Sequence, residues 1–183
     1  MKQYITIILL LGWCWSCQDP VSRKPIHQKN DHSLRVSIQR NKAIIASQQK
    51  LIEQAIQEDS VNLYTSSPAG YWFSKIKANE SPKPVTGDEV TFTFEIQTLD
   101  GEILYEQKEL GTINYLVDKE ELLPGLRYAV KDLGENEKGI FLIPSYLGYG
   151  YQGDGEKIGI NQPLRIVIEL KNIRRRKPLE ESK

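Results

Sequence analysis

The side chains that most often carry catalysis are confined to the start of this 183-residue chain. Both cysteines, Cys14 and Cys17, and both histidines, His27 and His32, lie within it. Ser-His and Cys-His catalytic pairs need one of these residue types, and so do conventional zinc sites. Beyond His32 we therefore expect no hydrolytic triad and no metal centre, and the sequence predicts no cofactor.

The charge balance argues against another class of function. Lys and Arg together number 24, and Asp and Glu together also number 24, so the formal net charge is zero. Nucleic-acid binding depends on excess positive charge that neutralises phosphates. We therefore expect no nucleic-acid partner.

Residues 1–16 predict a targeting signal. Lys2 gives a cationic start, and residues 4–15 form a mostly apolar run that is shorter than the ~18 residues needed to span a membrane. Ser16 places a small residue directly before Cys17, as in the lipobox that bacterial lipoproteins carry. This resemblance implies a lipoprotein signal peptide, acylation of Cys17 and a lipid anchor in the bacterial cell envelope, facing the periplasm. An ordinary signal peptide with incidental cysteines is the alternative.

Two different segments are predicted to follow the signal. Residues 17–36 are polar and lack apolar periodicity, which predicts a tether. Residues 37–60 predict an amphipathic helix, because Ile38, Ile45 and Ile52 recur on one face. This apolar face could pack on the domain that follows, or it could pair two copies of the chain into a homodimer through residues 37–60. The sequence leaves both alternatives open.

Residues 70–173 predict a domain with many strands and one short helix. Apolar and polar residues alternate from Val90 to Gln97, which is typical of a half-buried strand, and Asp100-Gly101 predicts a type I′ hairpin turn. Pro124 suits the first position of a helix with apolar residues at helical spacing.

Two more apolar segments, 140–144 and 164–171, predict buried strands near the end of this domain. An antiparallel sheet wrapped around one short helix buries the apolar side of each, so the predicted fold class is α+β, preceded by the long amphipathic helix. Residues 174–183 predict a charged tail.

Several short segments of this domain resemble the FKBP-type peptidyl-prolyl isomerase family in order and spacing. They are Thr86-Gly87-Asp88-Glu89-Val90, Asp100-Gly101, Leu122-Leu123-Pro124-Gly125-Leu126, Ile143-Pro144, Tyr149-Gly150 and Pro163-Leu164. With the lipobox and the preceding helix, the chain resembles more narrowly the gliding-motility-associated, FKBP-like lipoproteins of Bacteroidetes. The resemblance implies a lipid-anchored prolyl cis/trans isomerase that assists the folding of proline-containing envelope proteins, with gliding-motility components as a narrower hypothesis.

The chemistry of this family needs few reactive groups. Rotation about a peptide bond faces a barrier of ~18 to 20 kcal/mol, and no covalent bond is broken. A dry apolar pocket disfavours the dipolar amide resonance form, and a few donors hold the carbonyl during rotation. A domain without His or Cys is compatible with this reaction.

The resemblance also assigns roles to particular residues. Two hydrogen-bond donors are implied as catalytic groups, the hydroxyl of Tyr149 and the backbone N–H of Leu123. The implied substrate-binding residues are Phe94, Leu104, Tyr105, Leu122, Leu126, Ile158 and Ile166.

Some of these positions depart from the family pattern. Phe94 stands where active members have Tyr, and Leu104-Tyr105 stands where they have Phe-Asp. Leu126 replaces the Trp at the pocket floor, and Ile166 replaces a wall Phe. Apolar character is kept while aromatic area is lost. These departures favour the alternative function, a non-catalytic FKBP-like binding or chaperone module of an envelope assembly.

Overall fold

The computed structural model describes residues 31–79 and 81–176, without the side chains of residues 31 and 32. The predicted signal peptide and Cys17 lie outside the described residues. The chain divides into two compact units, residues 1–36 and 37–183. The long helix α2 (Asp31–Glu58) begins in the first unit, and all strands belong to the second.

Helix α2 begins earlier than the sequence pattern indicates. It starts at Asp31, so residues 31–36, predicted as the end of the polar tether, are helical. These six positions contain neither Gly nor Pro, and nothing in the backbone prevents the helix from extending through them. The isoleucine pattern begins at Ile38, which is 43% exposed, so it marks neither the start of the helix nor its first buried residue.

The C-terminal half of α2 packs on the domain that follows it. Ile52 is completely buried and clusters with Ile140, Leu142 and Val167 of the sheet. By contrast, Ile45 is 45% exposed. Intramolecular packing, one of the two alternatives for the isoleucine face, therefore accounts for Ile52, while a homodimer stays a prediction.

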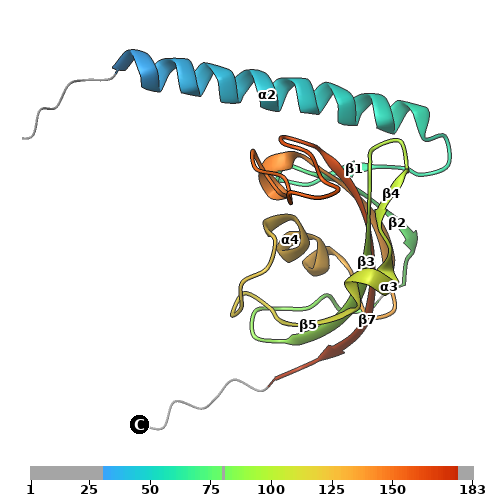
Figure 1. The fold of residues 1–183 in the computed structure, drawn as a ribbon. Helices are drawn as coiled ribbons and strands as arrows, with labels where there is room; N and C mark the ends of the chain where they lie inside the picture. The colour runs from blue at the N-terminus through green and yellow to red at the C-terminus, as the bar shows by residue number, and fades with distance from the viewer. Residues whose placement is uncertain (1–30, 80, 177–183) are drawn as a thin grey trace, which may run out of the picture. The chain divides into compact units, whose positions relative to one another are not determined.

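One seven-stranded antiparallel sheet forms the centre of the second unit (Figure 1). Its strands are β1 (Thr65–Ser66), β2 (Trp72–Lys77), β3 (Glu89–Gln97), β4 (Ile103–Tyr105), β5 (Thr112–Leu116), β6 (Lys138–Ile143) and β7 (Leu164–Arg174). Their order is β1-β2-β6-β7-β3-β4, and β5 also pairs with β3. The short helix α3 (Gln107–Leu110) connects β4 to β5.

The turn between β3 and β4 differs from the predicted type I′ turn. A type I′ turn needs positive φ at both central residues, whereas in this loop only Gly101 has positive φ, at 95°. The N–H of Gly101 donates to the carbonyl of Thr98, and the ladder has a register shift at Ile96 and Gln97. The prediction of a hairpin was correct and that of the turn type was wrong, because this hydrogen bond makes Leu99 and Asp100 the central residues of the turn and places Gly101 after them.

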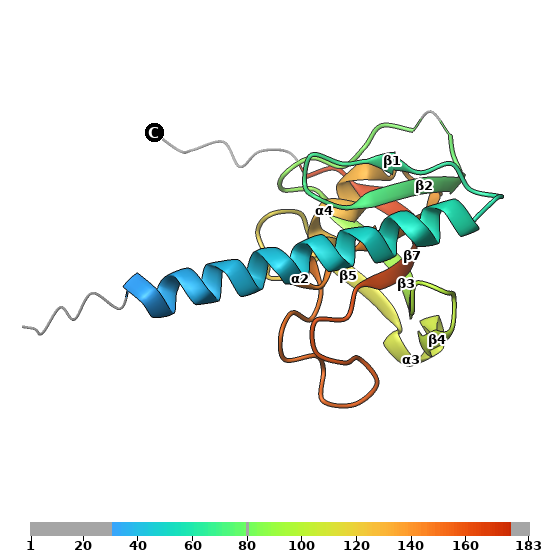
Figure 2. The same cartoon turned by 90° about the horizontal axis from the view of Figure 1, so that it is seen from above.

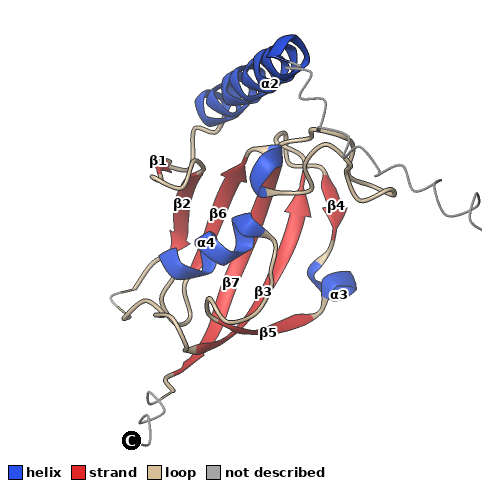
Figure 3. Ribbon diagram, turned by 90° about the vertical axis from the view of Figure 1, so that its left-hand side faces the viewer, coloured by secondary structure: helices blue, strands red, loops and turns tan. Residues whose placement is uncertain are grey.

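Helix α4 (Pro124–Asp132) lies across one face of the sheet (Figure 3). Pro124 occupies its first turn as predicted, and Leu126, Ala129 and Val130 are buried. Strand β3 turns Val90, Phe92, Phe94 and Ile96 into the same core cluster, with polar residues between them. The sheet and α4 therefore share the main core, as expected for an α+β domain.

The basic residues at the end of β7 are held by acidic partners. Arg175 donates to Asp88 at 2.8 Å, and Arg176 pairs with Glu89 at 3.1 Å. Strand β7 itself extends to Arg174. The start of the predicted charged tail is thus attached to the domain, because two carboxylates at the beginning of β3 lie beside it; residues 177–183 lie outside the described residues.

In the described part of the chain, no helix combines the length and the apolar character needed to cross a membrane.

Candidate active site

All nine residues predicted for substrate binding and catalysis lie in one hydrophobic cluster. Four are buried core members, Phe94, Leu126, Ile158 and Ile166. Five are partly buried and pack against that core, Leu104, Tyr105, Leu122, Leu123 and Tyr149. An apolar core flanked by partly exposed apolar side chains offers a surface that a proline ring can contact.

Several separate elements bring these residues together. Phe94 comes from β3, and the adjacent strand β7 provides Ile166. Leu126 lies in α4, and Leu123 directly precedes that helix. Tyr149 comes from the long segment between the 3₁₀ helix Ser145–Leu147 and β7, drawn in orange in Figure 2. The site therefore depends on the tertiary fold.

The backbone around Tyr149 is held by hydrogen bonds on both sides. The N–H groups of Gly148 and Gly150 both donate to the carbonyl of Ser145, at 2.9 and 2.8 Å. Gly150 has φ of 63°, a conformation that glycine adopts without steric cost. The chain thereby turns back on itself and presents the Tyr149 ring to the core cluster.

The hydroxyl of Tyr149 is a free donor within the structure. Among the described residues it has no hydrogen-bond partner. Burial raises its pKa above the ordinary value, and the negative charge of Asp154 raises it further. The hydroxyl therefore stays protonated at neutral pH and is available to donate to a carbonyl oxygen.

The backbone N–H of Leu123 is the second predicted donor. Leu123 is the N-cap of α4, and its carbonyl accepts from the N–H of Arg127 at 3.0 Å. Within the described part of the chain its own N–H has no acceptor. Amides at the start of a helix lack intrahelical acceptors and carry the positive end of the helix dipole, which suits an approaching carbonyl oxygen.

Asp154 is a site residue that sequence reasoning missed. It accepts hydrogen bonds from the hydroxyl of Tyr105 and from the N–H groups of Glu156 and Ile158, the latter two at 2.9 and 2.8 Å. Burial acts to raise its pKa, but these hydrogen bonds outweigh burial and lower it. The charged carboxylate fixes the loop that places Ile158 in the cluster. A lone Asp between glycines gave no signal beyond that of an ordinary turn.

Lys157 adds a second link between this loop and the β4 side of the site. Its ammonium lies 4.4 Å from the centre of the Tyr105 ring, a cation–π distance. It also pairs with Glu109 of α3 at 2.8 Å. The Tyr105 side chain is thus held both at its hydroxyl and at its ring face.

The residues predicted for the floor and for one wall of the site are closely packed. Leu126 is 3% exposed and Ile166 is 1% exposed. Next to Leu126, a Cβ added to Gly125 would lie 2.8 Å from a methyl carbon of Ile143. The packing around this part of α4 is therefore tight.

The family comparison agrees with this geometry. The model of FKBP-type peptidyl-prolyl cis-trans isomerases matches residues 80–171, half of the chain. The chain belongs to this family. The FKBP-family match covers β3 to β6 and most of β7, and it includes all nine predicted site residues.

One curated relative and several solved structures are similar to this FKBP-family chain. A probable FKBP-type peptidyl-prolyl cis-trans isomerase FkpA from Neisseria meningitidis serogroup B is 27% identical over 139 residues, which is 75% of this chain and 50% of that protein. The chain thus spans about half the length of the curated relative it matches.

Among solved structures, FkpA from Escherichia coli is 18% identical with a TM-score of 0.58, covering 93% of this chain and 82% of that one. A peptidyl-prolyl cis-trans isomerase from Pseudomonas syringae pv. tomato is 19% identical with a TM-score of 0.59, covering 73% and 96%. At such low identity these two structures support the fold alone.

The comparisons confirm two of the sequence predictions. The α+β, FKBP-like fold with a preceding helix is confirmed, and so is membership of the FKBP-type isomerase family. The roles given to Tyr149, Leu123 and the seven substrate-binding residues stay predictions, although the structure brings all nine into one cluster.

Proposed function

We propose that this protein catalyses cis-trans isomerisation of X-Pro bonds in polypeptide clients, at the cluster that contains Tyr149 and Leu123. One observation carries the proposal. The two groups predicted to hold the substrate carbonyl, the Tyr149 hydroxyl and the Leu123 N–H, both lack an internal acceptor among the described residues and both border the same apolar cluster.

The mechanism follows from the barrier to rotation. Amide resonance gives the C–N bond partial double-bond character and leaves negative charge on oxygen and positive charge on nitrogen. An apolar surface around the proline ring disfavours this charge separation, so the bond twists more easily. Tyr149 and Leu123 donate to the carbonyl oxygen and hold it while the C–N bond rotates. No proton is transferred, so the rate should change little with pH near neutrality.

Replacements at the floor of the site favour a second candidate, a non-catalytic binding or chaperone module. Leu126 and Ile166 are both buried and aliphatic, so the site has less aromatic area than one with aromatic residues at the same two positions. Such a surface could still hold a proline-containing segment without speeding rotation.

A direct assay separates the two candidates. The purified chain is mixed with a fluorogenic X-Pro peptide, and the relaxation rate from cis to trans is measured against the uncatalysed rate, which takes tens to hundreds of seconds. We expect a relaxation rate that rises linearly with protein concentration. Binding of the same peptide without any acceleration would contradict the enzyme and support the binding module.

We further propose that the protein acts in the bacterial cell envelope, attached to a membrane by acyl chains on Cys17. The support is the sequence Trp15-Ser16-Cys17 after a short apolar run. Each buried methylene of an acyl chain contributes about 0.8 kcal/mol to membrane affinity, so more than one chain gives stable anchoring. A role with gliding-motility components rests on the narrower sequence resemblance and is the most specific form of this proposal.

The anchor is tested by replacing Cys17 with Ala. The variant should be released from membranes by mild washing, whereas the wild-type chain should require detergent. Cys14→Ala is the matched control, because bulky Trp13 precedes that cysteine and makes it the weaker acylation candidate. Equal membrane retention of wild type and Cys17→Ala after carbonate extraction would refute the lipoprotein assignment.

A further inference from the structure

The side-chain amide of Gln48 connects α2 to both ends of the segment that carries Tyr149. Gln48 is only 3% exposed. Its Nε2 donates to Ser145 Oγ at 2.8 Å and to the Asn161 carbonyl at 2.9 Å. Its Oε1 accepts from the N–H of Ser145 at 2.8 Å. One buried amide therefore makes three hydrogen bonds to residues that lie far along the chain.

The two residues held by Gln48 are the ones that fix the backbone next to Tyr149. The carbonyl of Ser145 accepts from Gly148 and from Gly150, the two neighbours of Tyr149. The N–H of Asn161 donates to the carbonyl of Gly150 at 2.8 Å. Each glycine is thus hydrogen-bonded to Ser145 or Asn161, and both of these residues are hydrogen-bonded to Gln48.

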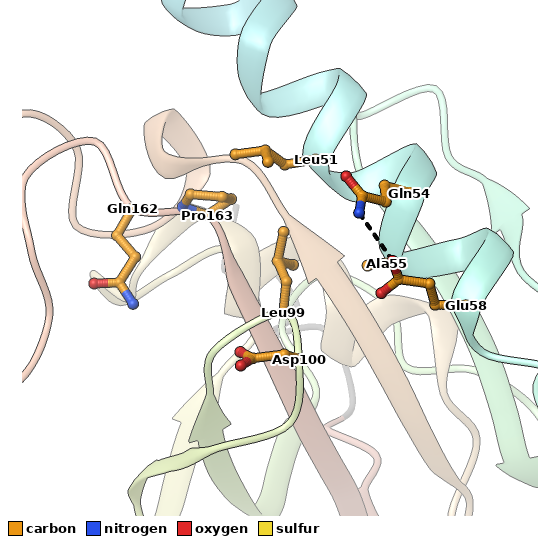
Figure 4. Close-up of a pocket in the computed structure, with 8 residues that line it drawn as sticks. All are labelled: Leu51, Gln54, Ala55, Glu58, Leu99, Asp100, Gln162 and Pro163. Carbon is orange, nitrogen blue, oxygen red and sulfur yellow. Dashed lines mark hydrogen bonds between the residues drawn. The ribbon is translucent and has the colours of Figure 1, made fainter.

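Open grooves flank the Gln48 contact on both sides. Toward the end of α2, a groove of about 310 Å³ separates the helix from the β3–β4 turn and from residues 162–163 (Figure 4). Figure 4 shows Leu51 and Ala55 on the helix side of this groove, and Leu99 and Pro163 opposite.

Toward the start of α2, a second groove of about 340 Å³ lies between Ile44 and Ile45 of the helix and Tyr146 and Tyr151 of the loop. Side-chain packing is open on both sides, and the hydrogen bonds of Gln48 make a specific connection between α2 and the Tyr149 segment.

We propose that Gln48 is a positioning residue for the active site, which acts through Ser145 and Asn161 to hold Tyr149 in place. The inference deepens the proposed isomerase function and rests on it for its catalytic consequence. It makes α2, which lies outside the part of the chain matched by the FKBP family, a contributor to catalysis. A hydroxyl held in advance loses less freedom when it meets the substrate carbonyl.

Attachment of the helix alone does not account for this arrangement. Ile52 lies one turn after Gln48 on the same side of α2, is completely buried, and packs on β6 and β7. That apolar contact already attaches the helix to the domain. The polar contact adds a defined position for residues 145–161, which contain no strand or helix after Leu147.

Amide hydrogen exchange on the full chain tests the structural half of the proposal. Gln48→Met keeps the length of the side chain and removes all three hydrogen bonds. It should speed exchange of the Ser145, Gly150 and Asn161 amides at least about tenfold, with exchange in the β3–β7 ladder unchanged. Gln49→Met is the matched control, since the side-chain amide of Gln49 donates to Glu53 within α2 and, among the described residues, to no residue of the Tyr149 segment.

Kinetics test the catalytic half. We expect kcat/KM of Gln48→Met on an X-Pro peptide to fall about tenfold, while Gln49→Met keeps the wild-type value. If Gln48 acts through Tyr149, the losses of kcat/KM caused by Gln48→Met and by Tyr149→Phe are not independent. The double variant Gln48→Met, Tyr149→Phe should then be little slower than Tyr149→Phe alone. If Gln48 has a purely structural role, the fold-losses in kcat/KM of the two single variants should multiply in the double variant.

Each outcome decides one part of the proposal. Unchanged exchange at Gly150 and Asn161 in Gln48→Met would refute the positioning role. Faster exchange with unchanged or multiplicative kinetics would refute its link to Tyr149. An inactive wild-type chain would overturn the proposed isomerase function together with this catalytic link, while the exchange rates would still decide whether Gln48 holds the loop.

Discussion

The hydroxyl of Tyr105 donates a hydrogen bond to the carboxylate of Asp154, which joins the end of β4 to the loop before β7. At the position of Tyr105 the family pattern has an aspartate. This chain places a tyrosine there and supplies a carboxylate from the opposite loop. A carboxylate therefore lies beside Tyr105, and it comes from the loop before β7 and accepts a hydrogen bond from this tyrosine.

Tyr105→Phe should loosen the loop that carries Ile158. The variant removes one hydrogen bond to a charged acceptor, so we expect the free energy of unfolding to fall. The ring, and with it the contact to Lys157, is retained. Chemical denaturation of wild type and variant measures the difference. An identical midpoint and slope for the two proteins would show that the bond contributes nothing.

The same bond predicts an alkaline transition. The hydrogen bond to Asp154 raises the pKa of Tyr105 to about 12, from an ordinary value of 10.0. Since the folded pKa lies above the unfolded one, this contribution to stability is complete below pH 10 and is lost as the pH rises toward 12. The pKa values of Tyr64 and Tyr71 are also raised, so tyrosinate absorbance during an alkaline titration should show one late-titrating group fewer in Tyr105→Phe than in the wild type. An equal number of late-titrating groups in the two proteins would contradict the raised pKa of Tyr105.

Tyr149→Phe should slow catalysis without affecting the fold. The substitution removes the free hydroxyl and keeps the ring packed on the core cluster. Loss of one hydrogen bond of about 1 to 1.5 kcal/mol in the transition state corresponds to roughly tenfold in kcat/KM. Tyr151→Phe is a suitable control because Tyr151 is 75% exposed. Equal rates for wild type and Tyr149→Phe would remove this hydroxyl from the mechanism.

Leu126→Trp should destabilise the protein. Leu126 is 3% exposed, and a Cβ added to its neighbour Gly125 would lie 2.8 Å from a methyl carbon of Ile143. Adding an indole to a filled core costs about 1 to 3 kcal/mol. Val61→Trp, at a residue that is 87% exposed, should leave the thermal midpoint unchanged. A stable Leu126→Trp variant with increased isomerase activity would instead show that the site has room for the aromatic floor.

The strands and α4 could be predicted from the sequence because burial follows simple periods. Strand β3 alternates buried and half-buried residues along its whole length, and α4 places its apolar residues at helical spacing. Such patterns show which face of a helix or strand is buried. Pro124 in addition indicates where α4 begins. The start of α2 carries no apolar pattern, so its first residues were predicted as tether.

The polar contacts of the site could not be predicted in the same way. Gln48 and Ser145 are 97 positions apart in the chain, and Tyr105 and Asp154 are 49 apart. A hydrogen bond between two isolated polar residues leaves no local period in the sequence. The nine apolar and donor residues came from family resemblance, whereas the residues that hold them became visible only in the folded chain.

The buried carboxylate of Glu137 should make the stability of the protein depend on pH in the acid range. This carboxylate accepts from Lys75 at 2.6 Å and from the N–H groups of Gly134 and Asn79 at 2.7 and 2.8 Å. Burial acts to raise the Glu137 pKa, but these three donors outweigh burial and lower it below the ordinary 4.5. The stabilisation is therefore complete above about pH 4.5 and is lost as the pH falls through the folded pKa.

Glu137→Gln tests this assignment. At neutral pH we expect the variant to be less stable by about 1.5 to 3 kcal/mol, with the difference from wild type shrinking below pH 4.5. Glu135→Gln, which changes a carboxylate two positions earlier, should leave the pH dependence intact. Denaturation midpoints across the acid range provide the measurement. A constant difference between wild type and Glu137→Gln at every pH would contradict the depressed pKa.

The packing of α2 gives the last prediction. Ile52→Ala leaves a cavity between α2, β6 and β7, and deletions of this kind in a filled core cost about 2 to 5 kcal/mol. Ile45→Ala, at a residue that is 45% exposed, should cost about 0.5 kcal/mol or less in a monomer. If residues 37–60 also pair two chains, Ile45→Ala would lower stability in a concentration-dependent way. Unfolding midpoints and molar mass over a wide concentration range therefore separate the two arrangements, and equal effects of the two substitutions would contradict intramolecular burial of Ile52.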